Sequence, residues 1–159
     1  MDPKVRQKTL RLISNGVYVL TARSGERLGA ATVTWVSQIS FRPPLIMAAV
    51  RRESNVFQCL AESGSAVLHI VGDGQRDIAK RFFYPTRAEA GKLNGEPYAA
   101  GQTAAPVLAR LPAHVECRVG RVIDAGGDHA MVILEAVEAE CAEAVQPLTI
   151  AQTPWHYGG

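Results

Sequence analysis

The sequence predicts a mostly β domain, a closed antiparallel barrel of about six strands with helices plugging its ends. Six segments of strand length are rich in β-branched and apolar residues. Turn-forming pairs such as Ser24-Gly25 and Gly126-Gly127 lie between neighbouring segments, as they do in hairpins. The predicted strands and helices do not alternate regularly, so a doubly wound parallel sheet is disfavoured.

The first third of the chain is expected to form one helix and three strands. Asp2 before Pro3 predicts the start of a short helix, which Asn15-Gly16 ends. The chain breaks again at Pro43-Pro44, because a residue before proline avoids the helical region. The three strands are expected over residues 17–23, 28–38 and 45–50.

The rest of the chain is expected to hold two helices and three more strands. Ser54 can cap a helix that Gly64 ends. Residues 75–83 place apolar side chains on one face and charged side chains on the other, as an amphipathic helix does. Residues 84–112 contain four prolines, which predicts a long, partly ordered loop. The strands are expected over residues 66–71, 114–124 and 129–140.

Composition limits the function classes. The 159 residues fit one domain over residues 1–159, and a net charge of +2 is too balanced for a protein that neutralises nucleic-acid phosphates. Three cysteines without metal-ligand spacing predict reduced thiols and no metal site. No signal peptide or membrane-length apolar run is recognised, so we expect a cytoplasmic protein without membrane contact.

Familiar catalytic motifs are missing from the sequence. It has no P-loop, no nucleophile elbow and no zinc-protease motif, and Gly72-Asp73-Gly74 lacks the third glycine of a dinucleotide turn. Residues 32–38 instead present hydroxyls and a carboxamide that can bind a flat heteroaromatic ligand, although a strand facing water would look alike. Arg51 and Arg52 before the Ser54 cap combine guanidinium charge with free helix N–H groups, which predicts either an anion site or a solvated surface.

Residues 29–64, GAATVTWVSQISFRPPLIMAAVRRESNVFQCLAESG, resemble the signature region of the flavin reductase-like FMN-binding split barrels. In that region a Thr-x-Ser/Thr stretch precedes a Pro-Pro-Leu strand and a Ser-x-Thr helix start. The resemblance continues in the helix over 75–83, in Gly127-Asp128-His129 and in the terminal Tyr157-Gly158-Gly159. It covers nearly the whole chain in the expected order, and it implies a six-stranded antiparallel split β-barrel with Greek-key topology and short peripheral helices.

The resemblance also assigns candidate site residues. It places the isoalloxazine and ribityl chain of FMN against Thr32, Val33, Thr34, Trp35, Ser37 and Gln38. It places the FMN phosphate at Arg51, Arg52, Ser54 and Asn55, with Lys80 and Arg81 as further phosphate-directed cations. Val56 stands where the family has a threonine. His129 is the candidate catalytic residue on the nicotinamide or substrate side of the flavin, and Tyr157 is a second candidate substrate contact.

The implied function is an FMN-dependent oxidoreductase. NADH or NADPH would reduce the flavin, and the electrons would pass to free flavin or to a partner flavin-dependent monooxygenase. The family's sites lie near a subunit interface, which implies a homodimer. Two alternatives remain open: an FMN electron-transfer protein with little NAD(P)H oxidation, and a small-ligand binding module without redox turnover.

Three other features have structural interpretations. His69 lies inside an apolar strand, as core histidines with satisfied hydrogen bonds do. His114, at a strand start near Pro112, is expected at the surface. The rings of Trp155, His156 and Tyr157 are expected to dock rather than to form a free tail.

Overall fold

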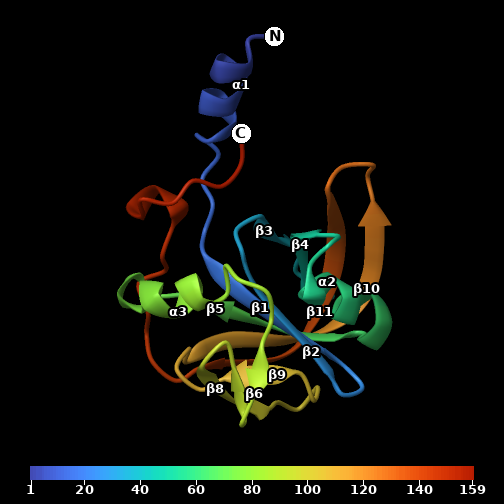
Figure 1. The fold of residues 1–159 in the computed structure, drawn as a ribbon. Helices are drawn as coiled ribbons and strands as arrows, with labels where there is room; N and C mark the ends of the chain where they lie inside the picture. Colours follow the sequence, from blue (N-terminus) through green and yellow to red (C-terminus); the bar gives the residue numbers. More distant parts are fainter.

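The computed structural model describes residues 1–159, except the side chain of Ser63. The fold is built on two antiparallel sheets (Figure 1). The main sheet has seven strands in the order β2-β1-β5-β10-β11-β4-β3. Its strands are β1 (Tyr18–Ser24), β2 (Arg27–Val33), β3 (Val36–Ser40), β4 (Leu45–Arg51), β5 (Ser65–Ile70), β10 (Ala113–Asp124) and β11 (His129–Cys141).

The prediction of six strands is wrong because the expected strand over 28–38 is two strands. The chain leaves β2 at Thr34 and Trp35, and β3 then begins on the opposite edge of the sheet. Only these two residues join the edges, so the edges lie close together at this point. The sheet therefore curls on itself, and over the described residues no ladder between β2 and β3 closes it into a barrel.

Residues 84–112 form a second, four-stranded sheet where a loop was predicted. Its strands are β6 (Ala88–Glu89), β7 (Lys92–Leu93), β8 (Glu96–Ala100) and β9 (Pro106–Leu108). Ala90-Gly91 and Asn94-Gly95 make two-residue turns with positive φ at both positions, the conformation of type I′ hairpins. Strands of two to five residues are too short to show periodicity, although Asn94-Gly95 is a hairpin signal.

The structure describes three α-helices, which are α1 (Pro3–Leu10), α2 (Asn55–Ser63) and α3 (Arg76–Arg81). Two short 3-10 helices are η1 (Asp73–Gln75) and η2 (Ile150–Gln152). Asp2 caps α1, which projects from the sheets and buries no residue (Figure 1). Ser54 caps α2, and Gly64 ends it with φ 72°, as the sequence predicts. None of the helices that the structure describes has the length and hydropathy needed to cross a membrane.

Two apolar clusters form the core. The larger one lies between the curled sheet and α2, and includes Leu20, Val50, Leu60 and Leu134. The smaller one lies under α3 and the returning C-terminal segment, and includes Val17, Val71, Ile78, Phe82 and Leu148. Burial of these side chains is the main force that holds the helices against the sheet.

Gly29 lets α2 lie directly on β2. A Cβ at this position would come 2.5 Å from the Val56 Cα and 2.7 Å from the Asn55 carbonyl oxygen. No side chain fits there unless the helix moves. This close approach fixes the N-terminus of α2 beside the middle of β2.

The two histidines in the middle of the sheet are both buried. The Nδ1 atom of His69 lies 3.1 Å from the Val19 carbonyl oxygen, and its Nε2 accepts a hydrogen bond from the Leu108 N–H at 2.9 Å. The prediction of a satisfied core histidine is therefore confirmed, and burial lowers the pKa of His69 to about 3. The surface prediction for His114 is wrong, because β10 pairs with both β5 and β11 there and leaves it 6% exposed.

Candidate functional site

A cleft of about 520 Å³ lies where β2, the β4–α2 junction, the segment after α3 and the C-terminal segment meet. Its volume is in the range of small-molecule and cofactor sites. The residues that line it are 30–34, 49–51, 53–55, 82–85, 150 and 155–157. The predicted residues Thr32, Val33, Thr34, Arg51, Ser54, Asn55 and Tyr157 are among them.

Small apolar side chains contribute to one wall of the cleft. Ala30 and Ala31 come from β2, and Ala49 and Val50 come from β4. Short side chains let a planar ring approach the backbone of both strands. The wall therefore suits a flat aromatic ligand.

Thr34 offers an unused polar group in this cleft. Its side chain is 5% exposed, and its buried Oγ1 has no hydrogen-bond partner in the protein. Thr32 differs, because its Oγ1 donates to the Ala79 carbonyl oxygen at 2.6 Å. A buried hydroxyl without a partner is unfavourable by about 1–3 kcal/mol, and a ligand in the cleft can satisfy it.

The N-terminus of α2 forms an anion-binding end of the cleft. Ser54 Oγ accepts from the Phe57 N–H at 3.2 Å and donates to the Arg51 carbonyl oxygen at 2.6 Å, which fixes the turn between β4 and α2. Asn55 Oδ1 accepts from the Thr86 N–H at 3.1 Å and ties this turn to the opposite wall. Free N–H groups at a helix start and the Arg51 guanidinium favour a phosphate.

A chain of hydrogen bonds lies beside the cleft. His129 Nδ1 lies 2.7 Å from Asp128 Oδ1, and His129 Nε2 lies 2.7 Å from the Tyr157 hydroxyl. An ionised carboxylate only accepts, so Nδ1 donates to Asp128, and Nε2 shares the second hydrogen bond with the Tyr157 hydroxyl. Trp35 packs against both rings, with centroids 4.7 Å from His129 and 5.3 Å from Tyr157. Tyr157 reaches the cleft wall, and His129 lies behind it.

The surroundings shift the pKa values of two members of this chain in opposite directions. Burial raises the pKa of the Tyr157 hydroxyl, Arg51 opposes that rise and Asp128 adds to it. The hydrogen bond from His129 is the main cause of a lowered pKa at Asp128. At neutral pH the hydroxyl therefore keeps its proton while the carboxylate is ionised.

Of the three C-terminal rings, Trp155 and Tyr157 dock as the sequence predicts, whereas His156 is exposed. Trp155 is half-buried and meets Phe83 edge to face at 4.9 Å. Arg11 Nε donates to the Gly158 carbonyl oxygen at 3.1 Å and anchors the end of the chain to the segment after α1. The C-terminal segment thereby supplies one side of the cleft.

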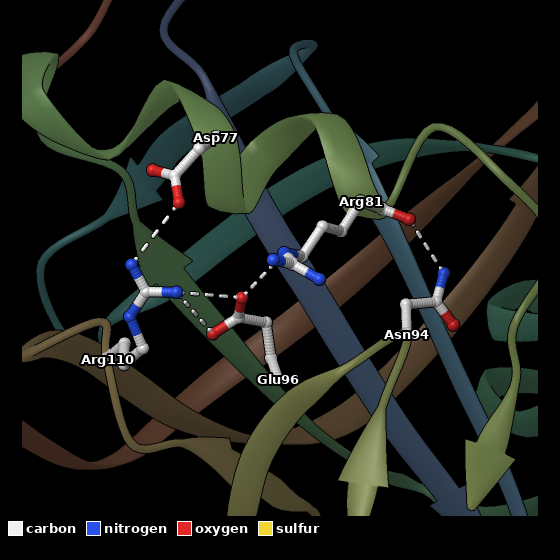
Figure 2. Close-up of polar contacts among 5 residues, drawn as sticks. All are labelled: Asp77, Arg81, Asn94, Glu96 and Arg110. Atoms are coloured by element: carbon white, nitrogen blue, oxygen red, sulfur yellow. Dashed lines mark hydrogen bonds and ion pairs between the residues drawn. The ribbon is translucent and has the colours of Figure 1, made fainter.

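Several predicted residues lie outside the cleft. Ser37 and Gln38 are exposed on β3 and hydrogen-bond to nearby backbone oxygens. Arg52 forms an ion pair with Asp124 of β10. Lys80 is exposed on α3, and the Arg81 Nε lies 2.9 Å from the buried Glu96 carboxylate (Figure 2).

Other cleft residues were not predicted from the sequence. The most prominent are Phe82, Phe83, Tyr84 and Pro85, which follow α3 and form the wall opposite α2. An aromatic run at the end of an amphipathic helix was the available signal. Their contribution depends on how the chain after α3 packs, which local sequence does not specify. Among the described residues no group of three or more His, Cys, Asp or Glu side chains is arranged to hold a metal ion.

The model of the flavin reductase-like domain matches residues 10–157 of the chain. The chain belongs to this family. The family assignment agrees with the resemblance of residues 29–64 and places nearly the whole curled sheet and the cleft within the shared domain.

Relatives within the family differ in length. A flavin reductase (NADH) of Kitasatospora aureofaciens is 34% identical over 124 residues, which cover 76% of this chain and 63% of that protein. Diflavin flavoprotein A 1 of Synechocystis is 29% identical over 141 residues, 87% of this chain but only 24% of that protein. The crystal structure of BorF, the flavin reductase component of a bacterial two-component tryptophan halogenase, is 25% identical with a TM-score of 0.76, over 92% of this chain and 91% of that one. The chain thus spans less than two thirds of the first two relatives.

Proposed function

We propose that this chain is an NAD(P)H-dependent flavin reductase that binds FMN in the cleft. One observation carries the proposal: the cleft joins a wall of small side chains, the unpartnered Thr34 hydroxyl and the anion-binding start of α2. A flavin mononucleotide has the matching parts, a flat ring with polar edges and one phosphate. When bound, the flavin supplies a two-electron acceptor for the hydride of NADH or NADPH and a donor for a later acceptor.

The residues of the chain have binding and positioning roles. Thr34 would hydrogen-bond a polar edge of the ring, and Ala30 and Ala49 would contact its face. Arg51 and the N–H groups at the start of α2 would hold the phosphate, while Ser54 and Asn55 fix the turn that presents them. Trp155 and Phe83 would cover the ligand and reduce its contact with water.

Tyr157 and His129 would shape the side of the cleft where a nicotinamide approaches. Asp128 orients the His129 ring, and His129 holds the Tyr157 hydroxyl at 2.7 Å. Hydride transfer depends on the relative position of two rings more than on an acid or base. Tyr157 is therefore assigned a contact with the second substrate, and His129 is assigned the positioning of Tyr157.

We also propose a single domain over residues 1–159, of the split-barrel type, that pairs with a second copy. Phe41 is 88% exposed and Ile39 is 50% exposed beside the edge strand β3. Exposed apolar side chains at a sheet edge favour association with another protein surface. The BorF likeness supports a partner oxygenase that uses the reduced flavin. Light scattering on the purified chain tests the pairing.

The proposed activity is tested by titration and turnover. Apoprotein titrated with FMN should quench flavin fluorescence, and NADH or NADPH should then bleach the flavin absorbance in anaerobic stopped flow. Thr34→Val removes the hydroxyl at nearly constant volume. It should lower FMN affinity by about tenfold because one hydrogen bond to the flavin is lost. Thr9→Val on α1 is the matched control. Absence of FMN binding by the unmodified protein contradicts the proposal.

A second candidate function is an FMN electron carrier with little NAD(P)H oxidation. The likeness to diflavin flavoprotein A 1 supports it, because the matched segment there is about a quarter of a larger protein. Bound FMN that neither NADH nor NADPH reduces, but that a one-electron donor reduces, would favour the carrier.

A further inference from the structure

A second cavity of about 620 Å³ lies next to the cleft, between the end of α3 and the two hairpins of the small sheet. We call it the basic pocket, and the lining residues used below are Arg81, Tyr84, Arg87, Glu89, Lys92 and Asn94. Tyr84 lines both the cleft and the basic pocket, so the two cavities are adjacent. A molecule that extends out of the cleft past Tyr84 reaches this pocket.

Buried contacts fix the frame of the pocket. Glu96 is 1% exposed, and its carboxylate lies 2.9 Å from the Arg81 Nε and 3.1 Å from the Arg110 Nη1 (Figure 2). Asn94 Nδ2 donates to the Arg81 carbonyl oxygen at 2.8 Å, and Asn94 Oδ1 accepts from the Arg87 N–H at 2.7 Å. These bonds connect the end of α3 to the hairpins, so the pocket is part of the folded structure.

The charges of the pocket favour an anion. Arg81 is already balanced by Glu96, whereas Arg87 and Lys92 are exposed. Glu89 is the carboxylate among the lining residues, and it lies 3.3 Å from Arg87 in an ion pair in which both side chains are more than 70% exposed. Such a pair contributes little and is readily exchanged for a stronger acceptor. A phosphate can accept bidentate hydrogen bonds from the Arg87 guanidinium and is attracted by the positive charge of the Lys92 ammonium group.

Tyr84 adds a surface for an aromatic ring. Its side chain is 71% exposed at the boundary between the cleft and the pocket. An exposed tyrosine can stack on a purine by burying apolar area on one ring face. A ring platform next to the exposed cations Arg87 and Lys92 matches an adenosine phosphate.

We propose that the basic pocket binds the adenosine phosphate group of a dinucleotide whose reacting ring lies in the cleft. This inference rests on the proposed flavin reductase function. The dinucleotides that carry the group in this context are FAD, NADH and NADPH, each through its adenylate, and NADPH adds a 2′-phosphate. All of them present an adenosine and a phosphate to Tyr84, Arg87 and Lys92.

Calorimetric titration with adenosine 5′-monophosphate and adenosine 2′,5′-bisphosphate tests the pocket directly. The double variant Arg87→Ala/Lys92→Ala should bind one or both probes with about tenfold lower affinity at low ionic strength. The same loss should shrink in about 0.5 M salt, since exposed charges are screened. Arg6→Ala/Lys8→Ala on the exposed helix α1 removes the same charges elsewhere and should bind both probes as the unmodified protein does.

Two comparisons identify the source of the group. A loss of FAD affinity with FMN affinity unchanged assigns the pocket to the flavin adenylate. A raised KM for NADPH with KM for NADH unchanged assigns it to the 2′-phosphate. Equal losses for NADH and NADPH assign it to the adenylate that both carry. Unchanged binding of both probes, or unchanged FAD affinity together with unchanged KM for NADH and NADPH, overturns the proposal. An equal loss of FMN and FAD affinity also overturns it. If the unmodified protein binds no FMN, the flavin reductase function fails, and the adenosine phosphate titrations still decide the pocket.

Discussion

Replacement of Arg51 by alanine tests the anion-binding end of the cleft. Arg51 ends β4, lines the cleft and precedes the Ser54 cap of α2. A hydrogen bond between charged groups contributes about 1.5–3 kcal/mol, and the exposure of Arg51 places it at the lower end. FMN affinity should therefore fall about tenfold. Riboflavin, which has no phosphate, should bind Arg51→Ala as it binds the unmodified protein.

Arg52→Ala is the matched control for this experiment. The two arginines are neighbours in sequence, but Arg52 pairs with Asp124 and does not line the cleft. Flavin fluorescence quenching gives the dissociation constants of FMN and riboflavin for both variants, and a melting curve checks that each is folded. Equal weakening of FMN by the two variants would show that the net charge, rather than the position of Arg51, determines binding. Equal loss of FMN and riboflavin would show that Arg51 acts on the ring or on the fold.

Three further predictions follow from particular contacts. Tyr157→Phe keeps the ring but removes the bond to His129, so stopped-flow flavin reduction should slow while FMN affinity stays constant; a change in FMN affinity alone would contradict a role toward the second substrate. Gly29→Ala should destabilise the fold by about 1–3 kcal/mol in urea unfolding because the added methyl overlaps α2, whereas Gly74→Ala, with open space around it, should be nearly neutral; equal effects would refute the packing argument. The pKa of His69 is about 3 in the folded state and near 6.5 in the unfolded state, so the unfolded state binds the proton first as the pH falls. The free energy of unfolding should therefore be unaffected by this group above pH 6.5. Below pH 6.5 it should decrease by up to about 1.4 kcal/mol per pH unit. His69→Gln should flatten that fall between pH 6.5 and 5.

Local sequence determined most strands of the main sheet, the helix caps and the family resemblance. Ser54 and Gly64 mark the ends of α2 because a hydroxyl satisfies the free N–H groups at its start and glycine adopts φ 72° at its end. Two strand-length segments on either side of Gly126-Gly127 predict the long hairpin of β10 and β11. The expected alternation of Val115, Cys117 and Val119 with Glu116 and Arg118 does not describe its burial, because Glu116 is buried as well as Cys117. Residues 29–64 carry enough family pattern to indicate a flavin site, and several of the residues they assign line the cleft.

The division of one expected strand into β2 and β3 was decided by tertiary structure. Residues 28–38 read as one continuous strand, and only the curl of the sheet makes Thr34 and Trp35 cross between its two edges. The burial of His114 likewise depends on pairing with β5 and β11, which lie far away in sequence.

The contacts of the charged and aromatic side chains also depended on partners that are distant in sequence. Arg51 and Arg52 are adjacent and chemically identical, yet one lines the cleft and the other pairs with Asp124, 72 positions away. Arg81 is bound to Glu96 because the small sheet folds under α3. Tyr157 becomes part of the site because the chain end returns to Trp35 and His129. Local propensity fixes backbone conformation over a few residues, whereas the partner of a side chain is set by which segments pack together, and that is the reason the site needed the tertiary structure.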